Sequence, residues 1–173
     1  MFSQKKKYTW LDIGCGHGEF VETLANFGGE NIDIIGLEPN VRKLEGARER
    51  GMDIKFFDLT THQDKYDVIS ALNVYSHLPN PPEDIARWCD MLNEGGELLL
   101  QTGDSANIPA EHHHKPYSLP DHLSFTSKKL LIDLLEGLGM EVIQVQNYRM
   151  GQYPIFSPLE LLKEIARFFL PGH

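Results

Sequence analysis

The sequence has few cysteines and no long apolar run, and both absences restrict what the protein can be. Among its 173 residues only Cys15 and Cys89 are cysteines. Two cysteines cannot form a disulfide framework, and their spacing matches no zinc motif. No apolar stretch approaches the roughly 18 residues of a membrane span, and the start of the chain, "QKKKYTW", contains no apolar signal core. These features favour a cytoplasmic protein that does not associate with a membrane.

Positive charge is also scarce. Lysine and arginine number 16 against 25 aspartates and glutamates, which gives a net charge of -9. The longest basic run is Lys5-Lys6-Lys7. This balance disfavours binding to phosphate backbones or anionic lipid, so no nucleic-acid partner is expected. The content of hydrophobic residues (41%) and charged residues (24%) is typical of a globular protein. The length predicts a single domain over 1–173 and leaves a homodimer open.

Apolar runs typical of buried strands alternate with amphipathic helical segments. Strands are predicted at 8–13, 33–38, 54–57, 66–71, 97–102 and 141–148. Helices are predicted at about 17–27 and 41–50, within 81–96, and within 126–139. This alternation indicates a mostly parallel sheet with helices on both faces, and right-handed crossovers make it doubly wound. The predicted fold is therefore α/β and Rossmann-like, with three layers (αβα) and six strands.

Two of the helices have clear end signals. The helix within 81–96 begins with proline and is expected to stop at a Gly-Gly pair. Its apolar residues recur at helical spacing: Ile85, Trp88, Cys89 and Leu92. For the later helix, Thr126 or Ser127 offers an N-cap, and Gly137 or Gly139 offers a C-terminal stop.

The connection at 103–124 is longer than most loops in a compact domain. Its sequence, "GDSANIPAEHHHKPYSLPDHLS", is rich in proline, histidine and aspartate. Connections of this length are usually functional or disordered, so we expect it on the substrate side of the site. A last amphipathic helix is predicted at about 158–170.

The first strand leads into a glycine-rich turn, "YTWLDIGCGHGEF". The glycines are spaced Gly14-x-Gly16-x-Gly18, and Glu19 occupies the position of the third glycine in the dinucleotide fingerprint. A pyrophosphate at this helix start would lie between the like charges of Asp12 and Glu19. A cofactor with an amino group and a sulfonium would be attracted to Asp12, and S-adenosylmethionine fits that description.

Two more acidic residues follow the next two strands. Glu38 ends the second strand, where a carboxylate accepts hydrogen bonds from both hydroxyls of a ribose. Asp58 follows the third strand and can accept a hydrogen bond from an adenine amino group, while Leu59 covers the ring. In open α/β sheets ligands bind at the carboxyl ends of the strands, where all three acids lie. Taken singly, Glu38 or Asp58 is also compatible with a helix cap or a solvated loop residue.

These segments, together with "YDVISALNVYSHLPNPPEDIARWCDMLNEGGELLLQT" and "LPDHLSFTSKKLLIDLLEGLGMEV", resemble the class I S-adenosylmethionine-dependent methyltransferases. The similar subgroup modifies small molecules and saccharides, and the resemblance covers about 8–147. It implies an enzyme that transfers a methyl group from S-adenosylmethionine to a small-molecule acceptor, most simply to a hydroxyl oxygen. The cofactor-binding residues that it implies are Asp12, Gly14, Cys15, Gly16, Gly18, Glu38, Pro39, Asp58, Leu59, Leu72, Asn73 and Val74.

The sequence also departs from that family in two respects. Relatives carry a helical N-terminal segment that folds over the cofactor and the substrate, and they close the sheet with a seventh, antiparallel strand. Neither is found here, so the usual seventh strand is expected to be missing. A catalytically silent module that binds S-adenosylmethionine therefore remains an alternative, as does a nicotinamide-dependent oxidoreductase, against which Glu19 and the acidic loop speak.

Methyl transfer to oxygen requires alignment and a base that takes the hydroxyl proton, but no metal. His122 and His77 match histidines that the family carries near its active site, and Asp121 could orient His122. An imidazole is well suited to accept a proton near neutral pH. A structural role for each histidine, in backbone hydrogen bonds or in packing, remains the alternative.

The run His112-His113-His114 does not by itself predict a metal site. In an extended segment, His112 and His114 would share one side, and His122 could add a third ligand. No further donor pattern supports this arrangement, so we predict no metal and expect a polar loop. Cys15 is expected to be a packing residue within the glycine loop and not a nucleophile.

Overall fold

The computed structural model of the chain describes residues 7–58, 64–109, 112 and 122–147. The chain divides into two compact units, Met1–Glu141 and Val142–His173, and the account below concerns the first. Of the second unit, residues 142–147 are described, and they are assigned to neither helix nor strand.

Strands and helices alternate along the first unit, as the hydrophobic pattern predicts. The strands are β1 (Tyr8–Ile13), β2 (Ile32–Glu38), β3 (Ile54–Phe56), β4 (Tyr66–Leu72) and β5 (Leu92–Gln101). The α-helices are α1 (Glu19–Gly28), α2 (Val41–Glu49), α3 (Pro81–Asp90) and α4 (Lys128–Gly137). Two short 3-10 turns are also present, η1 (Gly29–Asn31) and η2 (Tyr75–His77).

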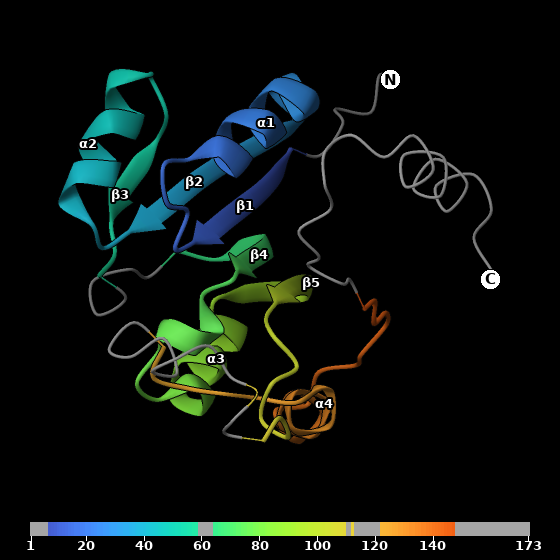
Figure 1. Cartoon of the computed structure of the whole chain (residues 1–173). Helices are drawn as coiled ribbons and strands as arrows, with labels where there is room; N and C mark the ends of the chain where they lie inside the picture. The colour runs from blue at the N-terminus through green and yellow to red at the C-terminus, as the bar shows by residue number, and fades with distance from the viewer. Residues whose placement is uncertain (1–6, 59–63, 110–111, 113–121, 148–173) are drawn as a thin grey trace, which may run out of the picture. The chain divides into compact units, whose positions relative to one another are not determined.

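The five strands form one parallel sheet in the order β3-β2-β1-β4-β5. The chain starts in the middle, adds strands toward β3, and then crosses to the other side of β1 with β4 (Figure 1). The strand order therefore reverses between β1 and β4, which makes their carboxyl ends the topological switch point of the sheet. In such sheets this is where a ligand crevice forms.

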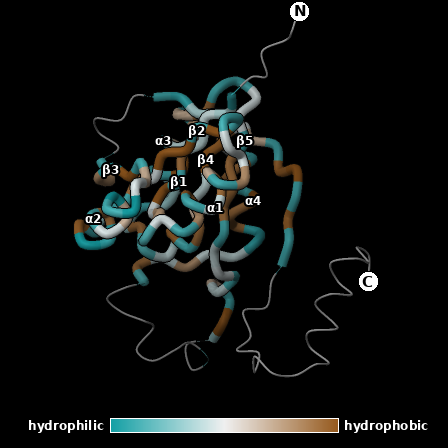
Figure 2. The backbone as a smooth tube through the Cα atoms, turned by 90° about the horizontal axis from the view of Figure 1, so that it is seen from above, coloured by the Kyte–Doolittle hydropathy of each residue, from teal (hydrophilic) through white to brown (hydrophobic). Residues whose placement is uncertain are grey.

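Helices cover both faces of the sheet, and each face has its own hydrophobic cluster. On one face Val21 of α1 and Leu44 of α2 pack with Ile34 and Ile54. On the other face the buried side chains of α3 and the half-buried leucines of α4 pack on β1, β4 and β5. Figure 2 shows the brown, hydrophobic segments along the central strands and the teal, hydrophilic residues along much of α2. The predicted doubly wound, three-layer α/β fold is confirmed.

The helix α3 ends earlier than its apolar pattern predicts. It stops at Asp90, and Leu92 already belongs to β5, where it pairs with Tyr66. The Gly-Gly pair lies inside β5, next to a register shift between Tyr66 and Val68, and Gly95 adopts a φ of 72°. The assignment of Leu92 to the helical stripe was therefore wrong. Its side chain still packs on the same core, because the strand places it on the same face of the sheet.

Of the two N-cap candidates, Thr126 and Ser127, it is Ser127 that caps the later helix. Its hydroxyl accepts a hydrogen bond from the backbone N–H of Leu130 at 3.3 Å. Gly139, with a φ of 82°, follows the helix end in the left-handed conformation that glycine adopts without a steric penalty.

The sixth strand predicted at 141–148 is not formed over residues 141–147. An extended segment counts as a strand only when a neighbour takes its backbone hydrogen bonds, and apolar content alone does not supply that neighbour. The sheet of the described residues therefore has five strands and not six.

Within the described residues, no helix has the length and apolar character needed to cross a membrane.

Candidate functional site

The turn between β1 and α1 is shaped by its glycines. The backbone N–H groups of Gly14 and Cys15 both donate to the carbonyl of Leu37 in β2, at 2.8 and 3.0 Å. Gly14, Gly16 and Gly18 have φ values of 68°, 60° and 82°. Residues other than glycine rarely adopt this left-handed backbone conformation, so the path of the backbone requires glycine at these three positions.

The three glycines face different surroundings. A Cβ on Gly14 would lie 2.6 Å from Val74 Cγ2, and one on Gly18 would lie 2.7 Å from Ile54 Cδ1. A Cβ on Gly16 would meet no heavy atom of the described chain within 4 Å. Gly14 and Gly18 therefore allow close packing, whereas Gly16 borders open space beside the switch point. In the dinucleotide fingerprint a glycine at position 19 would let the helix start pack closely. In this chain Gly18 has that role.

Asp12 is a buried acid beneath this turn. Its side chain is 2% exposed, and its Oδ1 accepts a hydrogen bond of 2.6 Å from the hydroxyl of Ser70 in β4. The indole of Trp10 donates to the same hydroxyl oxygen at 2.9 Å. The pKa of Asp12 is raised from its ordinary 3.8 to about 6, because the effect of burial, which raises it, is larger than that of the hydrogen bond from Ser70, which lowers it. No residue of the described ranges donates a hydrogen bond to Asp12 Oδ2.

Glu38, at the end of β2, connects the glycine turn to the start of α2. Its carboxylate is 5% exposed and accepts one hydrogen bond on each oxygen, from Gly16 N and Asn40 N, both at 2.8 Å. Each carboxylate oxygen has two lone-pair directions, so each can still accept a hydroxyl. The backbone bonds hold Glu38 beside Gly16, and Pro39 lies next to it in the same connection.

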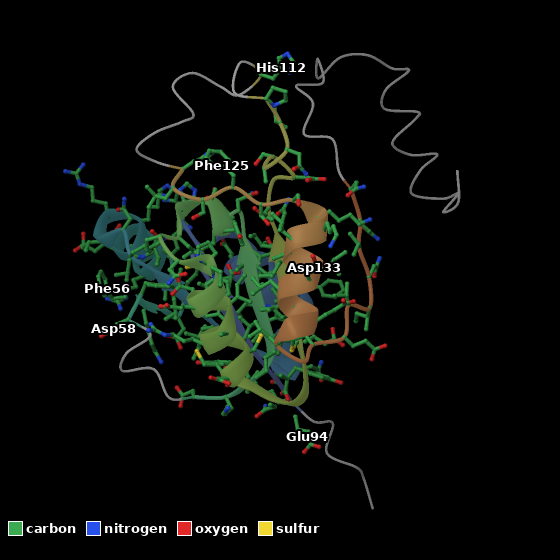
Figure 3. The ribbon with its side chains drawn as sticks, turned by 90° about the horizontal axis from the view of Figure 1, so that it is seen from below. Phe56, Asp58, Glu94, His112, Phe125 and Asp133 are labelled. Carbon is green, nitrogen blue, oxygen red and sulfur yellow. The ribbon has the colours of Figure 1, made fainter. Side chains whose placement is uncertain are left out.

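Asp58 follows β3 and is half-buried. Figure 3 shows it beside Phe56, whose side chain is 52% exposed at the end of that strand. Asp58 therefore lies past the carboxyl end of a strand adjacent to β2, as predicted. Leu59, expected to cover an adenine ring, lies outside the described residues.

The end of β4 supplies the residues predicted to line the methionine part of a cofactor. Leu72 ends the strand, and Asn73 adopts a φ of 60°, the one positive value among the described non-glycine residues. Its backbone N–H donates to the carbonyl of Gln101 at 2.9 Å. Val74 follows, and its Cγ2 lies 2.6 Å from the position that a Cβ on Gly14 would take. These residues and the glycine turn therefore meet across the switch point.

Cys15 is a core residue, in agreement with the expectation from the sequence. Its side chain is 8% exposed, and a Cβ on Gly36 of β2 would lie 2.6 Å from its sulfur. Burial, and then the negative charges of Asp12 and Glu38, raise the pKa of the Cys15 thiol to about 12. A thiol with such a pKa is protonated at neutral pH and is a poor nucleophile.

The two histidines selected from the sequence lie together. The rings of His77 and His122 are 5.1 Å apart between centroids and meet edge to face. The segment that follows His122 is fixed to η2, because the backbone N–H groups of Leu123 and Ser124 donate to the carbonyl of Ser76 at 2.6 and 3.1 Å. The Ser124 hydroxyl donates to the carbonyl of Leu78 at 2.7 Å. The histidine pair therefore stands on the loops that follow β4 and β5.

The third histidine region is separate. His112 is exposed, and Figure 3 shows it away from the strands on the connection after β5. Among the described residues, no group of three or more histidine, cysteine, aspartate or glutamate side chains could hold a metal ion. His113, His114 and Asp121 lie outside those residues, as does the helix predicted at about 158–170.

Sequence reasoning missed Trp10 and Ser70, although both contribute to the Asp12 environment. Their signal was present in the strand alternation, because Trp10 and Asp12 share a face of β1 and Asp12 pairs in register with Ser70. What was missing was the register, which the sequence does not state.

Comparisons with known proteins agree with this geometry. Residues 1–145 match the family model described as a methyltransferase domain. The chain belongs to the methyltransferase domain family. Over 145 aligned positions, this methyltransferase domain is 30% identical to the ubiquinone biosynthesis O-methyltransferase of Shewanella pealeana, with 73% of the chain and 60% of the relative covered. The protein of the same name from Aeromonas salmonicida is 28% identical, with 94% and 76% covered.

The methyltransferase domain spans about three fifths of the first of these relatives. Among solved structures it is similar to a mycolic acid cyclopropane synthase complexed with SAH, with a TM-score of 0.66, 14% identity, and 83% of this chain and 58% of that chain covered. It is also similar to coclaurine N-methyltransferase bound to N-methylheliamine and SAH, with a TM-score of 0.60, 20% identity, and 76% and 43% covered. At these identities the similarity establishes the fold.

Proposed function

We propose that the chain binds S-adenosylmethionine at the carboxyl ends of β1, β2 and β4 and transfers its methyl group to a hydroxyl oxygen of a small molecule. Membership of the methyltransferase domain family supports the reaction class. The name of the relatives, which specifies an O-methyltransferase, supports oxygen as the acceptor atom. The single-domain organisation predicted from the sequence is part of this proposal.

The observation that carries the proposal is the arrangement of acids around Gly16. Asp12 and Glu38 are both nearly buried, and each has acceptor capacity left over after its hydrogen bonds with the protein. Gly16 leaves open space next to them. Asp12 would hold the ammonium of the cofactor, Glu38 would hold the ribose hydroxyls, and Asp58 would hold the adenine amino group. The residues present therefore fit this cofactor.

When bound, the cofactor supplies a methyl carbon that its sulfonium has already activated for displacement. The chain supplies alignment of the acceptor and a base for its proton. The proposed base is His122, with His77 at its edge holding the ring in place. Both belong to loops at the carboxyl edge of the sheet, where the substrate of an open α/β fold binds.

The acids that flank the glycine turn disfavour the dinucleotide alternative. A pyrophosphate at the start of α1 carries two negative charges, and it would lie between Asp12 and Glu19, which stands in the first turn of that helix. A silent binding module is distinguished from an enzyme only by turnover.

Calorimetric titration tests the cofactor half of the proposal. We expect S-adenosylhomocysteine to bind and NAD not to bind, and we expect Glu38→Ala to weaken S-adenosylhomocysteine binding by about tenfold or more, because it removes the ribose acceptor. Asp33→Ala removes an acid from the amino end of the same strand, where it pairs with Lys7 at 3.6 Å, and serves as the control. Binding of NAD without S-adenosylhomocysteine would contradict the proposal.

A product assay tests the methyl-transfer half. The protein is incubated with S-adenosylmethionine and a panel of phenols, catechols and saccharides, and the methylated products are identified by mass spectrometry. We expect an O-methylated product from at least one acceptor. Tight cofactor binding without any product across the panel would favour the silent binding module.

A further inference from the structure

A chain of hydrogen bonds runs from Trp10 through Ser70 to Asp12, and its direction is fixed by chemistry. The Trp10 indole can only donate, so the Ser70 oxygen must accept from it at 2.9 Å. The single hydroxyl proton of Ser70 is then directed to Asp12 Oδ1 at 2.6 Å. Ser70 itself is fully buried, which leaves its hydroxyl no solvent partner.

Trp10, the first donor in this series of hydrogen bonds, is held by α1, the helix that follows the glycine turn. The Trp10 ring lies 6.0 Å from the ring of Phe20 between centroids, in an edge-to-face arrangement. Such a contact restricts the rotation of the indole and therefore the direction of its N–H. Residues of β1, β4 and α1 thus cooperate to hold one carboxylate oxygen of Asp12, Oδ1, while no described residue donates to Oδ2.

We propose that Ser70, held by Trp10, is a positioning residue that locks the Asp12 carboxylate with Oδ2 directed at the ammonium of the bound cofactor. This inference rests on the proposed function and adds two residues to it. Without the hydrogen bond from Ser70, the buried Asp12 carboxylate could rotate about its χ angles, and its affinity for a cation would fall. Ser70 removes that freedom before the cofactor binds.

The role of Ser70 is selective for one part of the ligand, and that selectivity makes it testable. S-adenosylhomocysteine contains the amino-acid ammonium, whereas 5′-methylthioadenosine shares its adenosine and its thioether sulfur but lacks the amino acid. Loss of Asp12 positioning should therefore affect the first ligand and spare the second. A general loosening of the fold would weaken both.

The experiment is calorimetric titration of the full chain with both ligands, for the wild type and three variants. Ser70→Ala is expected to raise the Kd of S-adenosylhomocysteine by about tenfold and to change that of 5′-methylthioadenosine by less than about twofold. Trp10→Phe, which keeps an aromatic ring and removes the N–H donor, is expected to act in the same direction by a smaller factor. Ser70→Thr restores the hydroxyl and is expected to recover most of the affinity for S-adenosylhomocysteine.

The matched control is Thr9→Val. The Thr9 hydroxyl also donates to a carboxylate, that of Asp67, at 3.2 Å, but at the amino end of β1 and far from the switch point. Thr9→Val should leave both affinities unchanged. If Ser70→Ala unfolds, Trp10→Phe carries the same comparison of ligands.

The outcomes distinguish the positioning role of Ser70 from the proposed function. A wild type that binds 5′-methylthioadenosine and S-adenosylhomocysteine equally well, or variants that lose both ligands by the same factor, would overturn the positioning role and leave the proposed function in place. A wild type that binds neither ligand would overturn the proposed function itself.

Discussion

At the scale of single residues, Asp12 is subject to two opposing requirements. Its carboxylate must be charged to attract a cation, yet its side chain is 2% exposed and burial raises its pKa to about 6. The native state therefore binds the Asp12 proton more tightly than the unfolded chain does. The stabilisation from this tighter binding is present below pH 4 and is lost as the pH rises through about 6. At neutral pH the charged Asp12 destabilises the free protein, and we attribute this cost to function.

The variant Asp12→Asn tests this balance. Its amide oxygen can still accept from Ser70 but carries no charge, so we expect the free energy of unfolding at pH 7.5 to rise by about 2 kcal/mol. The advantage should shrink as the pH falls through 6 and vanish near pH 4, while binding of S-adenosylhomocysteine weakens about tenfold at pH 7.5. Urea unfolding at several pH values, with calorimetric titration, measures both effects. An Asp12→Asn protein less stable than the wild type at pH 7.5 would show that the charge is not a burden.

At the scale of elements, the turn from β1 to α1 combines two separate tasks. Gly18 lies where a Cβ would clash with Ile54, so its lack of a side chain serves the packing of the helix start. Gly16 meets nothing within 4 Å in the described chain, so its lack of a side chain leaves space for a ligand. Both glycines also have positive φ values, so an alanine at either position introduces backbone strain of about 1 kcal/mol.

Alanine substitutions should separate these two tasks. Gly16→Ala is expected to lower the free energy of unfolding by about 1 kcal/mol. It is also expected to weaken S-adenosylhomocysteine binding strongly, because the added methyl group would enter the space proposed for the cofactor. Gly18→Ala is expected to cost about 2–4 kcal/mol of stability, since the strain and the clash add. Thermal unfolding and calorimetric titration of both variants make the comparison. Equal stability losses at the two glycines would contradict the division of tasks.

At the scale of the whole first unit, the order of the strands brings the site together. Because β4 pairs with β1 and not with β3, the carboxyl ends of β1, β4 and β5 are neighbours. The glycine turn, the end of β4 and the loop after β5 therefore meet there. The same topology brings His77 and His122 to a ring separation of 5.1 Å, although they follow different strands. The hydrogen bonds of Leu123 and Ser124 to η2 then hold that arrangement.

Histidine variants test whether this convergence is catalytic. Once an acceptor is known, His122→Ala is expected to lower kcat by about 10²–10⁴, the usual contribution of a general base, with the Kd of S-adenosylhomocysteine unchanged. His77→Ala is expected to reduce kcat by a smaller factor, because its proposed role is to hold the ring of His122. His112→Ala, on an exposed part of the preceding connection, is the control for a surface histidine. Full kcat in the His122→Ala enzyme would remove it as the base.

The features that the sequence allowed us to predict are those set by neighbouring residues. The alternation of strands and helices, the N-cap at Ser127 and the glycine positions follow from local periodicity and backbone conformation, and the structure confirms them. The placement of Asp12, Glu38 and Asp58 past or near strand ends was predictable for the same reason. Errors arose where a boundary depends on partners elsewhere, as for Leu92, which Tyr66 draws into β5, and for the unformed strand at 141–147.

The sequence by itself determined the fold class, the glycine turn and the acids that point to a cationic nucleotide cofactor, since short-range spacing is enough to specify each. Only the tertiary structure decided which side chains face one another. The hydrogen bond from Ser70 to Asp12 joins residues 58 positions apart, and the contact of His77 with His122 joins two loops. Both depend on strand register and strand order, which long-range packing selects and which no local pattern encodes.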